Sequence, residues 1–150
     1  MSSLDVPVRD DRRWPLWLLR FSLTATALLL FGQAVLAGLF MEGMHSAFAM
    51  HREMATVSGI VLMVAIGAAV AARVLGRGAR WPIAATLGLL GLMSLQAFAG
   101  FRSLVALHVP FGTVVIVLGA ALAVWAWLPR PTPGGREKPA EARGGSDAND

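Results

Sequence analysis

Methionine and histidine side chains gather in one short stretch, MEGMHSAFAMHREM, which covers residues 41–54. It contains four of the chain's seven methionines and two of its three histidines, His45 and His51, while the third is His108. Thioether and imidazole groups suit Cu(I), and imidazole is also an axial ligand of haem iron. Methionine is also a flexible filler of irregular apolar gaps. Three interpretations are therefore open: a copper-binding loop, half of a haem site, or packing at a membrane edge.

The elements that carry these residues are four long apolar stretches. The chain of 150 residues is 56% hydrophobic and only 15% charged, and its charges are confined to the two tails and three short breaks. A membrane-spanning helix needs about 20 apolar residues, and backbone in lipid must satisfy its own hydrogen bonds. The stretches of that length are Phe21–Phe40, Ala55–Ala72, Pro82–Phe101 and Leu104–Leu128.

Short breaks make consecutive helices antiparallel neighbours. We therefore predict an all-α integral membrane protein, an up-down-up-down four-helix bundle over residues 14–128. Residues 1–13 form a polar tail. Residues 129–150 are rich in proline, glycine and charge, which predicts a disordered tail.

The distribution of charge predicts the orientation. The net charge is +4, and all but two of the 13 lysines and arginines lie before the first stretch, between the second and third, or after the fourth. The positive-inside rule then places both termini in the cytoplasm of a bacterial-type plasma membrane, and this placement argues against a nucleic-acid partner. The tryptophans agree, since all fall at the same predicted interface: Trp14, Trp17, Trp81, Trp125 and Trp127.

A weak internal repeat relates the two halves. LLLFGQAVLAGLF and GLMSLQAFAGFRS each carry Gln-Ala near the outer end of an outward helix, at Gln33 and Gln96. In each half a break and an inward helix with a histidine follow, His51 in the first and His108 in the second. Sites in membrane proteins with such repeats tend to lie between the halves.

The two histidines lie at a common depth. His51 precedes Val74 by 23 residues and His108 precedes Leu128 by 20, so their depths differ by only about 4–5 Å at about 1.5 Å per residue. The second and fourth helices of such a bundle are diagonal, so both imidazoles can point at the central axis. Small residues continue the same faces, Ala55 beneath His51 and Gly112 beneath His108. Small residues beneath two level histidines fit a slot for a haem, although small residues are also common wherever membrane helices touch.

Polar residues around this level could hold the haem propionates. Arg52 and Arg102 are the only arginines at the outer end, and each suits a charge-assisted bond to a carboxylate; their alternative role is contact with lipid headgroups. Gln33 and Gln96 could hydrogen-bond a propionate or an imidazole, or simply link helices. We expect all four as cofactor-binding residues.

The same residues resemble a known family. MHREMATVSGIVLMV resembles the histidine-arginine opening of a ligand helix in the haem A synthase family, and LQAFAGFRSLVALHVPFG resembles its glutamine-bearing helix and second ligand helix. The resemblance covers roughly residues 28–128. It implies a four-helix half-unit with His51 and His108 as axial ligands of a b-type haem. Members usually contain two such halves, so a homodimer of this chain would recreate eight helices.

Two departures from the family change the implied activity. The active half carries a carboxylate one turn before its first histidine, where this chain has Phe48, and the paired cysteines of an outer loop are absent because the chain has no cysteine. We therefore assign no catalytic residue and expect no oxidation of the haem methyl, although Glu42 or Glu53 could approach the site. Two protein ligands fill both axial positions, which favours electron transfer with a membrane redox partner, or haem handling.

Two other function classes stay open. One is an accessory or interaction protein without a cofactor, whose histidines only pack. The other is a Cu(I) site in the outer loop, because Met41/His45 and Met50/Met54 have the i,i+4 spacing that brings side chains together on a helix.

Overall fold

The computed structural model describes residues 13–76 and 78–129, and within them it contains four helices and no strand. The helices are α1 (Trp14–Met41), α2 (Ser46–Gly76), α3 (Trp81–Phe101) and α4 (Val105–Trp127). The predicted all-α four-helix bundle is confirmed. The two predicted tails, except Arg13 and Pro129, lie outside the described residues.

Proline and turn residues set the ends of the helices. Pro15 and Pro82 occupy the first turns of α1 and α3, where a missing N–H costs nothing. The α1–α2 turn contains Gly43 at φ +99°, a conformation that favours glycine, and the α3–α4 turn contains Ser103 at φ 58°. Helix α1 begins seven residues before its predicted apolar stretch, and α2 begins nine residues before its own, in a segment that carries Arg52 and Glu53.

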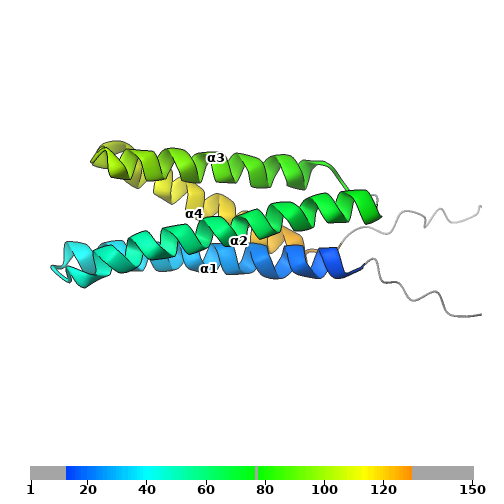
Figure 1. The fold of residues 1–150 in the computed structure, drawn as a ribbon, viewed down its shortest axis with the longest axis horizontal. Helices are drawn as coiled ribbons and strands as arrows, with labels where there is room; N and C mark the ends of the chain where they lie inside the picture. The colour runs from blue at the N-terminus through cyan, green and yellow to red at the C-terminus, as the bar shows by residue number, and fades with distance from the viewer. Residues whose placement is uncertain (1–12, 77, 130–150) are drawn as a thin grey trace, which may run out of the picture.

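The helices form a bundle in which chain neighbours pack together and α1 also packs on α4 (Figure 1). Across the described residues, no Cα atom of α2 comes within 8 Å of one in α4, so these two helices are diagonal, as predicted. The α1–α2 turn extends farther from the bundle than the α3–α4 turn (Figure 1). A residue several turns of helix away from the α1–α2 turn can therefore lie level with a residue that is closer to the α3–α4 turn.

The outer surface of the bundle is apolar. Leu23, Leu62, Leu89 and Val115 lie fully buried in the core, yet only 22–28% of each helix's most apolar window is buried. Water would disfavour so large an exposed apolar surface, whereas lipid is its natural solvent. All four helices are long and apolar enough to cross a membrane, and the chain is a small multi-pass membrane protein.

The tryptophans gather at the end opposite the α1–α2 and α3–α4 turns. The rings of Trp81 and Trp125 lie 4.1 Å apart, and Trp17 lies 5.9 Å from Trp127. Here Arg20 Nε donates a 2.8 Å hydrogen bond to the backbone oxygen of Ala126, which joins the start of α1 to the end of α4. The position of this end in the cytoplasm stays a prediction.

Candidate functional site

The imidazoles of His51 and His108 face each other between the diagonal helices α2 and α4. Their ring centres lie 6.3 Å apart and their planes meet at 65°. Both side chains are half-buried. The proximity expected from their common depth is therefore found, although the backbones of the two helices stay apart.

Each histidine hydrogen-bonds the backbone of the glutamine in its own hairpin. His51 Nδ1 donates to the carbonyl oxygen of Gln33 at 3.0 Å, and His108 Nδ1 donates to that of Gln96 at 2.8 Å. A carbonyl oxygen only accepts, so each Nδ1 carries a proton and a neutral ring keeps its lone pair on Nε2. The two halves of the repeat thus hold their histidines in the same way.

The two Nε2 atoms differ in their surroundings. Gln96 Nε2 lies 3.3 Å from His108 Nε2, and its N–H donates to that lone pair. His51 Nε2 has no hydrogen-bond partner among residues 13–76 and 78–129. The side chain of Gln33 turns away and donates to Ser58 Oγ at 3.1 Å, so its amide links α1 to α2 instead.

The small residues on the helices around the histidines have distinct roles. A Cβ on Gly100 would lie 2.8 Å from His108 Nδ1, and one on Gly112 would lie 3.3 Å from Gln96 Nε2, so both glycines admit this side-chain pair. Ala55 lies half-buried one turn below His51. Two turns deeper, a Cβ on Gly119 would lie 2.8 Å from the Leu30 side chain, so there the core is closed.

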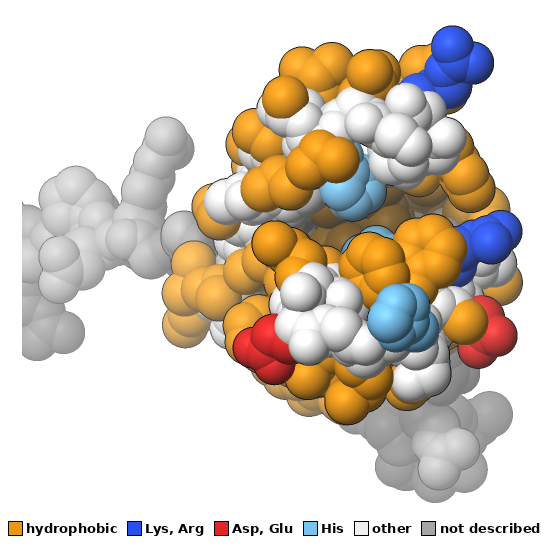
Figure 2. All heavy atoms as spheres, turned by 90° about the vertical axis from the view of Figure 1, so that its left-hand side faces the viewer, with side chains coloured by type: hydrophobic (Ala, Val, Ile, Leu, Met, Phe, Trp, Pro, Cys, Tyr) orange, Lys and Arg blue, Asp and Glu red, His pale blue; other side chains and the backbone are white. Residues whose placement is uncertain are grey.

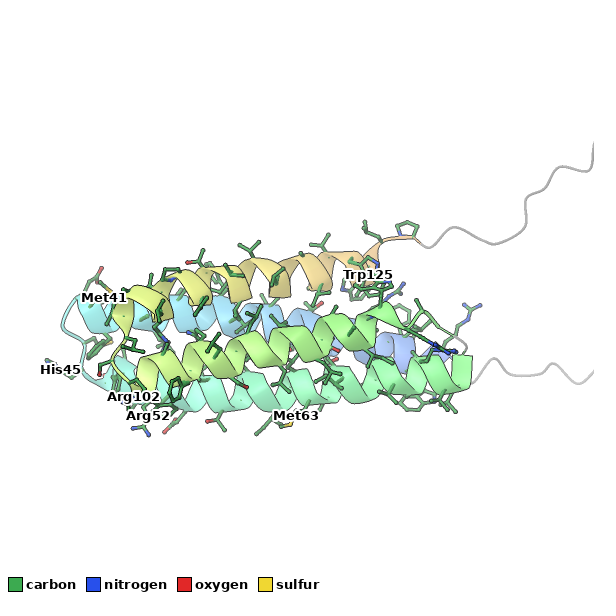
Figure 3. The ribbon with its side chains drawn as sticks, turned by 90° about the horizontal axis from the view of Figure 1, so that it is seen from above. Met41, His45, Arg52, Met63, Arg102 and Trp125 are labelled. Carbon is green, nitrogen blue, oxygen red and sulfur yellow. The ribbon has the colours of Figure 1, made fainter. Side chains whose placement is uncertain are left out.

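The two arginines predicted to bind propionates are exposed. Arg52 and Arg102 lie at the end of the bundle that carries the hairpin turns (Figure 3). Among the described residues neither guanidinium has a hydrogen bond or an ion pair. Both are free to bind an anion at that level, and equally free to contact lipid headgroups.

Only one of the two predicted i,i+4 pairs in the methionine-rich stretch, Met50 and Met54, shares a helix. Helix α1 ends at Met41 and α2 begins at Ser46, so Met41 and His45 do not share a helix, and that expectation was wrong. His45 lies on the turn and points away from the bundle (Figure 3). Met54 does lie on α2 one turn after Met50, but its sulfur lies 3.0 Å from the ideal Cβ position of Gly32 on α1, whereas Met50 is exposed.

Among the described residues, no carboxylate lies where the resembled family carries one. Phe48 packs against Phe40, with ring centres 5.2 Å apart, and both Glu42 and Glu53 are exposed. Within the part of the chain that the structure describes, no group of three histidine, cysteine or acidic side chains is placed to hold a metal ion. Any metal centre here would depend on the histidine pair and on ligands that a cofactor brings.

The separation of the histidine pair fits two axial ligands of one metal. A metal–nitrogen bond is about 2.0–2.1 Å long, and the ring centre of an imidazole lies about 1.1 Å beyond its nitrogen. Two imidazoles on opposite sides of one metal therefore have their ring centres about 6.3 Å apart. The observed separation is 6.3 Å. Figure 2, which faces this end of the bundle, shows a hollow between two groups of side chains with histidines at its edge.

One side chain interferes with that fit. The Gln96 amide occupies the lone pair of His108 Nε2, so this amide must rotate before that nitrogen can ligate a metal. A glutamine side chain has several staggered rotamers, and a change of rotamer would take its amide away from His108 Nε2. The separation of the two imidazoles and their Nδ1 bonds are therefore compatible with ligation of one metal ion once the Gln96 amide has moved.

Comparison of the sequence with known protein families, with curated proteins and with solved structures finds no match.

Proposed function

We propose that this chain is a small membrane b-type haem protein in which His51 and His108 ligate one haem iron. The observation that carries the proposal is the 6.3 Å separation of two imidazoles held across diagonal helices. Ionisable side chains inside membrane bundles are costly and usually functional, and bundle cores commonly hold cofactors between facing side chains. The resemblance to a haem A synthase half-unit is part of the same proposal.

The bonds at Nδ1 suit this role. Metal-ligating histidines almost always donate their other ring N–H to a carbonyl or carboxylate, which fixes the tautomer and the orientation of the ring. His51 and His108 do so through the backbone oxygens of Gln33 and Gln96. A helix backbone moves little, so each ring is oriented before any ligand arrives.

Each residue of the site would have a separate role in binding the haem. His51 presents an open Nε2, whereas His108 must first release the Gln96 amide, so we expect His51 to bind first. Arg52 and Arg102 would hold the haem propionates, and Ala55 and Gly112 would line the haem site. A bound haem supplies one-electron redox chemistry, and with both axial positions filled by protein the chain would transfer electrons or handle haem.

The test is the absorbance spectrum of the purified chain, produced with a haem supply and kept in mild detergent. We expect sharp low-spin α and β bands after reduction with dithionite. His51→Ala and His108→Ala should each lose the low-spin bands, because one axial ligand is removed.

His45→Ala is the matched control, since His45 is exposed on the turn and should leave the spectrum unchanged. Circular dichroism of each variant separates loss of haem from loss of fold. A folded wild-type protein without low-spin bands after haem reconstitution would overturn the proposal, as would equal loss of haem in all three variants.

A cofactor-free accessory role is the alternative, and one observation favours it. Both ring nitrogens of His108 already have protein partners in the Gln96 backbone and side chain. A histidine that is satisfied in this way can act simply as a polar link between α3 and α4. This role predicts a colourless wild-type protein in the same experiment.

A copper role keeps weaker support, because Met41, Met44 and Met50 are exposed whereas the sulfur of Met54 packs against Gly32 of α1. If Cu(I) binds there, changing the four methionines together to leucine should abolish the titration. An unchanged titration would exclude the site.

A further inference from the structure

A groove opens between α2 and α3 at the end of the bundle opposite the histidines. It has a volume of about 710 Å³ and is open to the surroundings. Its lining combines two cationic side chains with four apolar ones: Arg73, Val74, Arg80, Ile83, Ala84 and Leu87. It is independent of the proposed haem site, since none of these residues lies near His51 or His108.

The cationic part of the groove lies where the helices end. Arg73 stands in the last turn of α2, and Arg80 immediately precedes α3. Neither guanidinium has a hydrogen bond or an ion pair among residues 13–76 and 78–129. The only carboxylates of those residues, Glu42 and Glu53, belong to the opposite end of the bundle. Two positive charges therefore face the groove without a described partner.

The apolar part of the groove runs from these charges along α3. Ile83, Ala84 and Leu87 follow Arg80 at three, four and seven residues, so they share one helix face that extends about 10 Å from the arginine toward the middle of the span. Leu87 is 51% exposed, as befits a side chain on an uncovered surface. A matching ligand has an anionic head and a hydrocarbon chain directly below it.

We propose that the groove binds one anionic phospholipid. Its phosphate lies between Arg73 and Arg80, and one acyl chain follows Ile83, Ala84 and Leu87. Charge complementarity selects an anionic headgroup over a zwitterionic one, and basic pockets between transmembrane helices are a recurring form of lipid recognition. Trp81 follows Arg80 at this interface, where an indole ring is typically found beside headgroups.

The bound lipid joins the two hairpins. The start of α1 and the end of α4 are already joined through Arg20 and Ala126. No such hydrogen bond is found between the end of α2 and the start of α3 within the described residues. A phosphate held by Arg73 of α2 and by Arg80, which immediately precedes α3, adds a contact between the two hairpins beside the short loop that connects these helices.

The test titrates the detergent-solubilised full chain with dioleoyl phosphatidylglycerol and counts bound lipids by native mass spectrometry. Dioleoyl phosphatidylcholine, which has the same acyl chains and no net charge, provides the comparison. We expect one phosphatidylglycerol to bind first and more tightly than phosphatidylcholine. Each arginine near an anionic headgroup contributes a factor of about five, so Arg73→Gln with Arg80→Gln should weaken the first binding step about 30-fold.

The matched control, Arg136→Gln with Arg143→Gln, removes the same charge at two positions outside the described residues. It should change the affinity of the first binding step less than twofold. If the double variant fails to fold, the single variants Arg73→Gln and Arg80→Gln decide, with about fivefold weakening each. Equal affinity for the two lipids in the wild-type protein would overturn the proposal. Equal weakening in the control, which indicates general attraction to the surface, would overturn it as well.

Discussion

Replacing Gly100 with alanine should displace His108 from its hydrogen bond. The ideal Cβ at position 100 lies 2.8 Å from His108 Nδ1 and 2.9 Å from Cε1, both closer than ordinary contact. Comfortable separation of such atoms begins at about 3.5 Å, so the ring must move by about 0.7 Å. That movement takes the 2.8 Å bond from His108 Nδ1 to the Gln96 carbonyl to the edge of hydrogen-bond range.

The expected cost follows from these distances. Weakening the hydrogen bond costs about 0.5–1.5 kcal/mol, and an off-rotamer ring costs about 0.5–1.5 kcal/mol more. Alanine recovers at most about 1 kcal/mol of helix propensity. Gly38→Ala is the control, because Gly38 lies near the outer end of α1 and its Cβ would meet nothing within 4 Å. The free energy of unfolding should therefore be about 1–3 kcal/mol lower for Gly100→Ala than for Gly38→Ala.

The assay is equilibrium unfolding in mixed detergent micelles by titration with dodecyl sulfate, followed by circular dichroism. The ring nitrogen signals of His108 in NMR spectra report the hydrogen bond directly and should change only in Gly100→Ala. If the two alanine variants unfold alike and the His108 signals stay unchanged, α3 does not approach His108 as described, and the reasoning fails.

Two further predictions concern buried polar contacts. Ser58→Ala removes a fully buried hydroxyl that accepts a hydrogen bond from Gln33, so it should lower the free energy of unfolding by about 1–3 kcal/mol. Ser94→Ala is the control and should change this free energy little, because Ser94 is exposed and bonds only within its own helix. Equal effects of the two substitutions would contradict the prediction. Arg20→Lys keeps the charge but loses the Nε–H that binds the Ala126 carbonyl, so it should lower the midpoint of thermal unfolding in detergent; an unchanged midpoint would show that this bond does not stabilise the bundle.

The fold was largely predictable because lipid leaves a chain few options. Apolar length and the need to satisfy the backbone predict helices at four places, and short breaks make them antiparallel. The diagonal placement of α2 and α4 follows from that order. The helix ends were less predictable, since α2 begins at Ser46, nine residues before its apolar stretch, in a segment that also carries Arg52 and Glu53.

The histidine pair was partly predictable. Counting residues from the inner ends gives a common depth, and the structure places the rings 6.3 Å apart. The hydrogen bonds from the histidines to the glutamine backbones were not predicted, although the sequence contains a signal for them. Gln33 and His51 are each nine residues from Glu42 in the first turn, and Gln96 and His108 are each six residues from Arg102 in the second. Equal distances from a turn place residues side by side in an antiparallel hairpin.

The sequence by itself determined the solvent of this protein, its number of helices and the depth of its two inner histidines, because each depends only on hydrophobic length and on the fixed rise of a helix. Tertiary structure decided which atoms meet: that Gln33 binds Ser58 while Gln96 binds His108, and that Met41 and His45 separate at a turn. The physical reason is that these contacts depend on how two hairpins rotate and slide against each other. Side-chain packing along their whole length sets that rotation and offset, so no local pattern encodes them.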